Sequence, residues 1–119
     1  MTELNTFGSI LSYAIELEAQ LQGYYLDIGD ESRARDAEKR KKKLERVRRE
    51  HVVEITLEPI EGLNPADYTL NLADKSATGQ RTIEETAARF YADVAPKINV
   101  REAQRALQKC GKQHQALLD

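Results

Sequence analysis

Apolar residues recur at intervals of three and four positions along most of the chain, which is the period of a helix that buries one face. The clearest stripe of this period lies between residues 3 and 28, and weaker stripes follow it along the chain. The clear stripe consists of Phe7, Leu11, Ala14, Glu18, Leu21, Tyr25 and Ile28. The pattern predicts four helices, at about residues 3–28, 31–57, 82–96 and 100–118.

Residues typical of helix ends separate these stretches. Gly29 and Asp30 are expected to stop the first helix and to cap the second. Thr82 opens the sequence Thr-Ile-Glu-Glu, a capping box that predicts the start of the third helix. Asn99 is suited to cap the fourth helix.

The segment of about residues 58–81 has no strong periodicity. Pro59 is expected to end the second helix, and Pro65 predicts a single helical turn at residues 65–68. Only Tyr68–Leu72 hints at strand alternation. A connection this long needs a structural reason, which a crossover between two helical hairpins supplies. We therefore predict an all-α, single-domain four-helix bundle made of two hairpins joined by this crossover.

The two halves of the chain align with each other, which indicates an internal repeat. Residues 14–25 (AIELEAQLQGYY) align with 80–91 (QRTIEETAARFY), and 44–55 (LERVRREHVVEI) align with 107–118 (LQKCGKQHQALL). Each half thus has a Glu and then a Tyr on its first helix, and a His near the end of its second. The pairs are Glu18 with Glu84, Tyr25 with Tyr91, and His51 with His114.

The position of the repeated Glu and His residues points to the core. Glu18 stands mid-stripe, where a buried unpaired carboxylate would be strongly unfavourable or would become protonated. His51 and His114 also lie on apolar stripes. Such residues on four helices can converge at one level of a bundle, and converging carboxylates and imidazoles are how bundles bind metal ions.

The order of the motifs is specific: AIELEAQLQGYY, a second helix ending in R-x-E-H, then E-x-x-A-x-x-F-Y and a final His. Over essentially the whole chain this order resembles the rubrerythrin branch of the ferritin-like superfamily. The resemblance implies a ferritin-like fold that holds two irons, with one Glu from the first helix of each half and a Glu-x-x-His pair from the second. Such enzymes reduce peroxide or oxidise ferrous iron. The matching ligand positions are Glu18, Glu84, His51 and His114.

The chain departs from this pattern at the bridging carboxylates. Arg48 stands three residues before His51, and Gly111 three before His114, where the family has Glu. An intact di-iron centre is therefore not expected, and the Cys-x-x-Cys pair of a rubredoxin domain is missing. Two alternatives remain. One is a metal-free core in which Arg48 pairs with Glu18 or Glu84. The other is a single iron, manganese or zinc ion held by two Glu and two His.

Three further residues are candidates for supporting roles. Tyr25 and Tyr91 are expected either to hydrogen-bond to Glu18 and Glu84 or to pack as core aromatics. Cys110 lies four residues before His114, a spacing that can chelate a soft metal. A lone buried Cys is more often a small core residue.

Charge and composition narrow the possible partners. The 119 residues have a formal net charge of −2, but residues 33–49 hold ten Lys and Arg against three Asp and Glu, a net +7. No aromatic residue interleaves with this basic run for base stacking, so we interpret it as a solvated helix face or a contact with an acidic surface, not as a nucleic-acid site.

No apolar run is long enough to span a membrane. The absence of a signal sequence and the single Cys favour the cytoplasm.

Two functions of different classes follow from these observations. The first is a degenerate ferritin-like bundle that serves as a non-catalytic binding or structural module without a cofactor. The second is a metal-binding oxidoreductase that acts on peroxide or iron. A homodimer is also expected, because the longer first pair of helices should overhang the second pair and expose apolar side chains. The side chains expected to be exposed are Ile10, Leu26 and Ile28.

Overall fold

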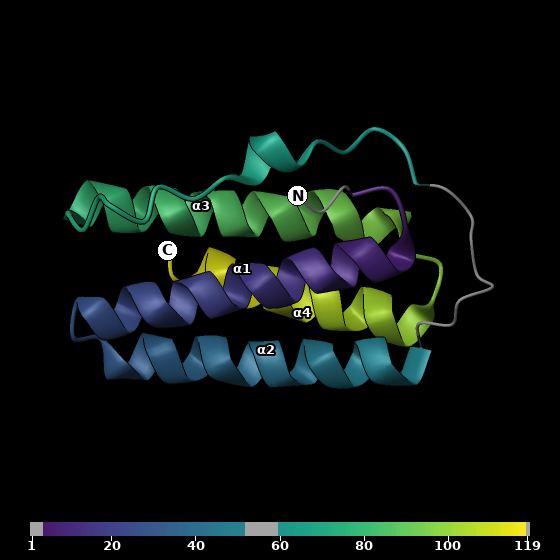
Figure 1. Ribbon diagram of the computed structural model, residues 1–119, viewed down its shortest axis with the longest axis horizontal. Coiled ribbons are helices and arrows are strands. Elements are labelled where there is room, and N and C mark those ends of the chain that lie inside the picture. Colours follow the sequence, from purple (N-terminus) through teal and green to yellow (C-terminus); the bar gives the residue numbers. More distant parts are fainter. Residues whose placement is uncertain (1–3, 52–59, 119) are drawn as a thin grey trace.

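The computed structural model describes residues 4–51 and 60–118, which form a bundle of four helices (Figure 1). The α-helices are α1 (Phe7–Asp27), α2 (Glu31–His51), α3 (Ala77–Val94) and α4 (Arg101–Ala116), with short 3-10 turns η1 (Pro65–Tyr68) and η2 (Ala95–Lys97). The helices run along the long axis of a body of 43 × 26 × 25 Å. The described ranges contain no strand, and no helix within them is long and apolar enough to cross a membrane.

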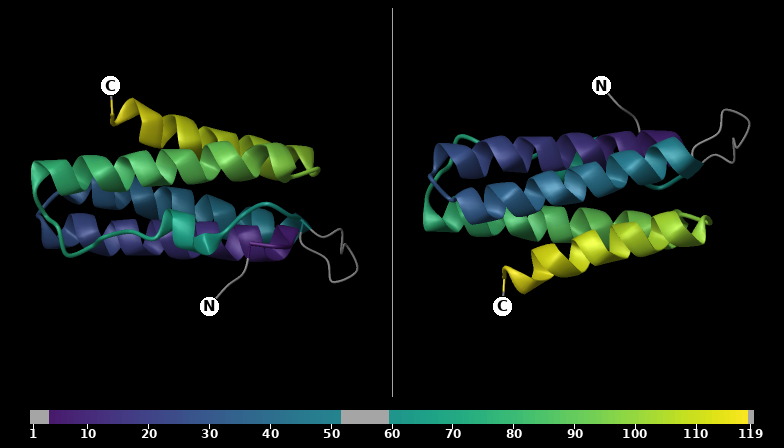
Figure 2. Two further views of the ribbon diagram at one scale, coloured as in Figure 1. Left: turned by 90° about the horizontal axis from the view of Figure 1, so that it is seen from above. Right: turned by 90° about the horizontal axis from the view of Figure 1, so that it is seen from below.

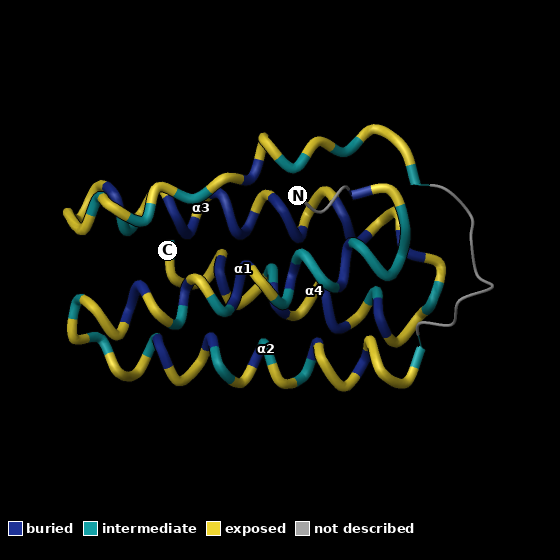
Figure 3. The backbone as a smooth tube through the Cα atoms, in the orientation of Figure 1, coloured by how far each residue is buried: buried dark blue, intermediate teal, exposed yellow. Residues whose placement is uncertain are grey.

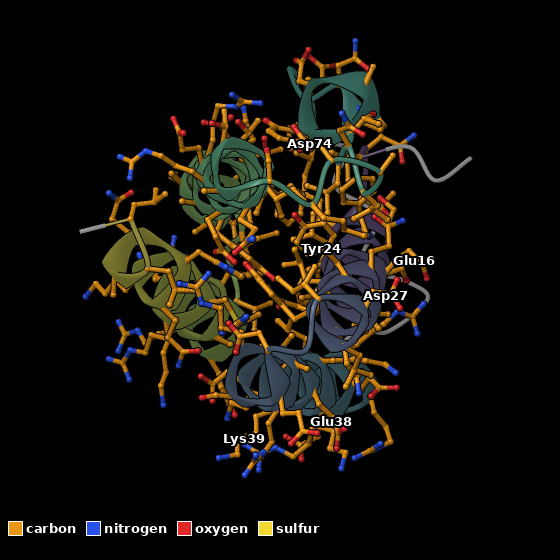
Figure 4. All side chains as sticks on the ribbon, turned by 90° about the vertical axis from the view of Figure 1, so that its left-hand side faces the viewer. Glu16, Tyr24, Asp27, Glu38, Lys39 and Asp74 are labelled. Atoms are coloured by element: carbon orange, nitrogen blue, oxygen red, sulfur yellow. The ribbon has the colours of Figure 1, made fainter. Side chains whose placement is uncertain are left out.

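The helices pair as two hairpins. α1 packs against α2, α3 packs against α4, and α2 also packs against α4. Residues 60–76, which we call the crossover segment, run along the bundle to the end at which α3 begins (Figure 2). Seen end-on, the helices follow the order α1, α2, α4, α3, and the crossover segment lies between α3 and α1 (Figure 4).

Tyrosine hydroxyl groups attach the crossover segment to both neighbouring helices. The Tyr24 hydroxyl on α1 donates a hydrogen bond to the backbone oxygen of Asp74 at 2.7 Å, and Figure 4 shows the two residues on the same side of the bundle. The Tyr68 hydroxyl on η1 donates to Asp93 Oδ2 on α3 at 2.6 Å. The turn at residues 65–68 was predicted from Pro65 and is confirmed.

The hairpin between α1 and α2 turns where the sequence indicates. Gly29 has φ of +79°, a left-handed conformation that glycine adopts without strain. Asp30 Oδ1 accepts a hydrogen bond from the Arg33 backbone N–H at 3.1 Å and so caps α2. The predicted roles of Gly29 and Asp30 are therefore confirmed.

The third helix begins earlier than predicted. Ser76 caps α3, because its hydroxyl accepts a hydrogen bond from the Gly79 backbone N–H at 3.1 Å. The Thr82 hydroxyl, expected to cap the helix, instead donates to the Thr78 backbone oxygen at 2.9 Å inside it. The prediction of a start at Thr82 is wrong because two potential caps lie six residues apart and the earlier one is used.

Other helix boundaries differ by a few residues. α1 begins at Phe7 instead of about residue 3, and α4 ends at Ala116 instead of about residue 118. Val100, not Asn99, occupies the N-cap position of α4. The predicted end of the second helix near residue 57, and Pro59 beyond it, lie outside the described residues.

The buried positions of the helices lie mostly on the sides that face the interior of the bundle (Figure 3). Within the described residues, α1 and α2 span 21 residues each, against 18 for α3 and 16 for α4. Ile10 is fully buried within the chain, so its predicted exposure is wrong. Ile28 packs partly against the core, and Leu26 alone of the three is exposed, at 55%. The homodimer stays a prediction.

Two helical glycines provide a matched test of this packing. A Cβ at Gly79 would lie 2.4 Å from the Asp74 backbone oxygen, whereas one at Gly23 on α1 would meet nothing within 4 Å. We expect Gly23→Ala to raise the free energy of unfolding by up to about 1 kcal/mol through helix propensity. Gly79→Ala should lower it by about 1–3 kcal/mol through the clash. Urea denaturation measures both, and equal stabilisation by the two substitutions would contradict the close approach of the crossover segment to α3.

Candidate functional site

Six polar side chains from all four helices form a cluster inside the bundle, which we call the polar core. Its ionisable members are nearly inaccessible: Glu18 and His114 are 0% exposed, Glu84 1% and Arg40 5%. Burial of so many polar groups is tolerated only where each finds a partner. The members are Glu18 and Tyr25 on α1, Arg40 on α2, Glu84 and Tyr91 on α3, and His114 on α4.

The imidazole ring of His114 lies between the two carboxylates. Its Nε2 is 2.8 Å from Glu18 Oε2, and its Nδ1 is 2.5 Å from Glu84 Oε2. Ionised carboxylates only accept hydrogen bonds, so both ring nitrogens must carry protons to donate to them. The contacts therefore fit His114 in its charged, doubly protonated form.

The pKa values of His114 and Glu18 shift in the direction that keeps these two groups charged. Burial acts to lower the pKa of His114, but its hydrogen bonds to Glu18 and Glu84, together with the negative charges of these carboxylates, outweigh burial and leave that pKa raised. Burial likewise acts to raise the pKa of Glu18, and the His114 hydrogen bond together with the charges of His114 and Arg40 leaves it lowered. The polar core thus favours ion pairs over neutral side chains.

Arg40 supplies the second positive charge. Its Nε donates to Glu18 Oε1 at 2.8 Å, and its Nη1 donates to Gln113 Oε1 at 3.2 Å. Its Nη2 is buried and has no partner among the described residues. With Glu18 and Glu84 ionised and His114 protonated, two negative and two positive charges cancel.

The two tyrosines cross between the halves of the repeat. The Tyr91 hydroxyl on α3 donates to Glu18 Oε2 at 2.5 Å, and the Tyr25 hydroxyl on α1 donates to Glu84. Burial raises the pKa of both hydroxyls, which keeps them protonated as donors. Each tyrosine thus bonds to the carboxylate of the other half, and the predicted hydrogen bonding of Tyr25 and Tyr91 to Glu18 and Glu84 is confirmed.

His51 and Arg48 lie outside the polar core. His51 Nε2 is 3.0 Å from Glu102 Oε2 near the surface. Arg48 Nε donates to Ser12 Oγ at 2.9 Å on the exposed surface, so the predicted pairing of Arg48 with Glu18 or Glu84 is wrong. At 1.5 Å per residue, Arg48 lies about 12 Å and His51 about 16 Å along α2 from Arg40, too far to reach the same carboxylate.

Arg40 is the residue that the sequence reasoning missed, although the turn position points to it. Gly29 lies 11 residues after Glu18, and Arg40 lies 11 residues after Gly29. Residues at equal distances from the turn of an antiparallel hairpin face each other, because both helices rise equally per residue. The repeat alignment had instead matched His51 to His114, and it takes no account of the axial offset between α2 and α4.

Gly111 and Cys110 have structural roles in α4. A Cβ at Gly111 would lie 2.9 Å from Tyr91 Cβ, so the glycine lets α4 approach α3 beside the polar core. Burial, with a smaller effect from Glu18, raises the pKa of Cys110 to about 12. The thiol therefore stays protonated at neutral pH.

The polar core does not fit the metal ions that the family resemblance implies. Glu18 and Glu84 bind opposite edges of the His114 ring, so the carboxylates do not converge on one point. The Arg40 guanidinium contacts Glu18 where a cation would need the carboxylate. Among the described residues, three potential ligand atoms lie within 4.8 Å of one another only near the surface, at Glu50, His51 and Glu102.

Comparisons with models of known protein families, with curated proteins and with solved structures find no match.

Arg40 and Arg48 provide a matched pair on one helix. Replacing Arg40 with Met should leave Glu18 buried beside one cation fewer and lower the free energy of unfolding by about 3–5 kcal/mol. Arg48→Met, on the surface, should change it by less than about 0.5 kcal/mol. Denaturation by urea measures both values.

A second substitution separates lost charge from lost packing. Adding Glu18→Gln to Arg40→Met removes the uncompensated negative charge, so the double variant should regain part of the lost stability. Equal losses for Arg40→Met and Arg48→Met would contradict the assignment of Arg40 as the neutralising residue.

Proposed function

We propose that this chain is a ferritin-like bundle of the rubrerythrin type in which internal ion pairs have replaced the metal centre. In this proposal it serves as a non-catalytic binding or structural module. The motif order and the internal repeat support the family assignment. The two hairpins and the crossover segment along the bundle are compatible with it (Figure 1).

The observation that carries the proposal is the neutralisation of Glu18 by Arg40 and His114. The Arg40 Nε and His114 Nε2 atoms each lie 2.8 Å from a Glu18 oxygen. Metal ions added to this balanced set of charges would leave excess positive charge in a medium of low polarity, which is strongly unfavourable. The side chains that would bind metal in the family instead bind one another.

The burial of the polar core also favours a structural role. Glu18, Glu84 and His114 are at most 1% exposed, and a groove between α2 and α4 includes Arg40 but none of these three. A catalytic acid or base needs contact with its substrate. The hydrogen bonds of the polar core join all four helices and so specify how they pack.

Metal analysis tests this proposal. Protein purified without chelator and incubated anaerobically with Fe²⁺ or Mn²⁺, then desalted, should retain far less than one ion per chain. Near-stoichiometric metal that is lost in a folded Glu18→Gln variant would overturn the proposal and favour the oxidoreductase.

The surface group gives the matched control for that experiment. Metal that persists in Glu18→Gln but disappears in His51→Gln would belong to Glu50, His51 and Glu102. That result would leave the proposed role of the polar core unchanged. Circular dichroism of each variant checks that the helices are retained.

A further inference from the structure

A groove of about 720 Å³ runs between α2 and α4, beside the polar core. Figure 4 shows Lys39 on the side of α2 nearer α4, with Glu38 toward α1. Five basic residues line the groove, and Asp36 is the one acidic residue among its lining. The basic residues are Lys39, Arg40, Lys43, Arg46 and Lys109.

The positive charge of the groove is mostly uncompensated. Lys39, Lys43 and Lys109 have no ion pair with any carboxylate in the part of the chain that the structure describes. Arg46 has only a distant contact, 3.9 Å from Glu50. Like charges that face each other across a groove repel one another, so a bound anion would relieve this repulsion.

The guanidinium group of Arg40 provides hydrogen-bond donors on the side of the groove that faces the polar core. Arg40 lines the groove, although only 5% of its surface is exposed. Its Nη2 has no hydrogen-bond partner among the described residues. Its Nε bond to Glu18 fixes the guanidinium plane. The two Nη atoms form the edge with which arginine binds phosphate or carboxylate oxygens.

Gln113 covers this edge with a neutral acceptor. Its Oε1 accepts from Arg40 Nη1 at 3.2 Å, while the residue itself is exposed and lines the groove. An exposed side chain can change rotamer at little cost. An anionic oxygen that replaced the Gln113 amide oxygen would form stronger, charge-assisted hydrogen bonds with Nη1 and Nη2.

We propose that the α2–α4 groove binds a small molecule with two or more phosphate groups, with one phosphate on the Nη edge of Arg40 and the others between the lysines. The phosphate compound would be the ligand of the binding module proposed above, so this inference rests on the proposed function. Lys39, Lys43 and Arg46 lie at successive turns of α2 and extend about 10 Å along it, which suits several linked anionic groups. A single-stranded nucleic acid fits less well, because no aromatic residue lines the groove to stack on its bases.

Titration calorimetry with inorganic pyrophosphate, at low ionic strength and without divalent ions, tests the proposal. The parent protein should bind one pyrophosphate per chain. Lys43→Gln with Lys109→Gln should weaken the affinity by about tenfold or more. The control, Lys41→Gln with Lys112→Gln, removes the same charge from the same two helices outside the groove and should have a much smaller effect.

Gln113→Glu tests the assigned Arg40 edge without removing Arg40. The new carboxylate should pair with Nη1 and Nη2, raise the free energy of unfolding and abolish most pyrophosphate binding. Gln115→Glu adds the same charge about 200° around the helix and should leave binding nearly unchanged. Equal effects of the groove and control variants, or no pyrophosphate binding by the parent, would overturn the proposal.

Two further outcomes are decisive. Tighter binding of a short single-stranded RNA than of pyrophosphate, lost in the same groove variants, would overturn the small-molecule assignment in favour of nucleic acid. Citrate binding that matches pyrophosphate would overturn the preference for phosphate over carboxylate groups. The metal analysis above tests the proposed function separately. If the parent protein holds no metal and does not bind pyrophosphate, the proposed ligand is wrong but the proposed function is not contradicted.

Discussion

The buried carboxylate of Glu18 is the constraint on which the rest of this structure depends. An ionised carboxylate that is 0% exposed requires opposite charge and hydrogen-bond donors within reach. Arg40, Tyr91 and His114 meet this requirement from the other three helices. The packing of the bundle is therefore tied to one hydrogen-bond network, and His114 extends that network to Glu84.

The same network links the interior to the α2–α4 groove. Arg40 neutralises Glu18 through Nε, and the opposite edge of its guanidinium lies toward Gln113 and the α2–α4 groove. In the binding site that we propose, the residue that neutralises Glu18 in the core therefore also presents a donor edge to an anion. The two proposals, a core without a metal centre and an anion site beside it, share one structural basis, which is the position of Arg40 on α2.

The sequence predicted the features that depend on local residue pattern. It did not predict the features that depend on the axial position of one helix relative to another. The four helices, the turn at Gly29 and the importance of Glu18, Glu84 and His114 follow from periodicity and from polar residues on apolar stripes. The misplaced residues, Arg48 and His51, came from an alignment of repeats that carries no information on the level of each residue along the bundle. Counting residues outward from the hairpin turn supplies that level and identifies Arg40.

The most direct test of this account is the protonation state of His114, measured by ¹⁵N NMR of the imidazole nitrogens. The chain has only two histidines, so a His51→Gln variant assigns the signals. At about pH 7.5, above the ordinary histidine pKa of 6.5, both ring nitrogens of His114 should still carry protons, because each donates to a carboxylate. A neutral His114 with one unprotonated nitrogen at that pH would contradict the internally neutralised core.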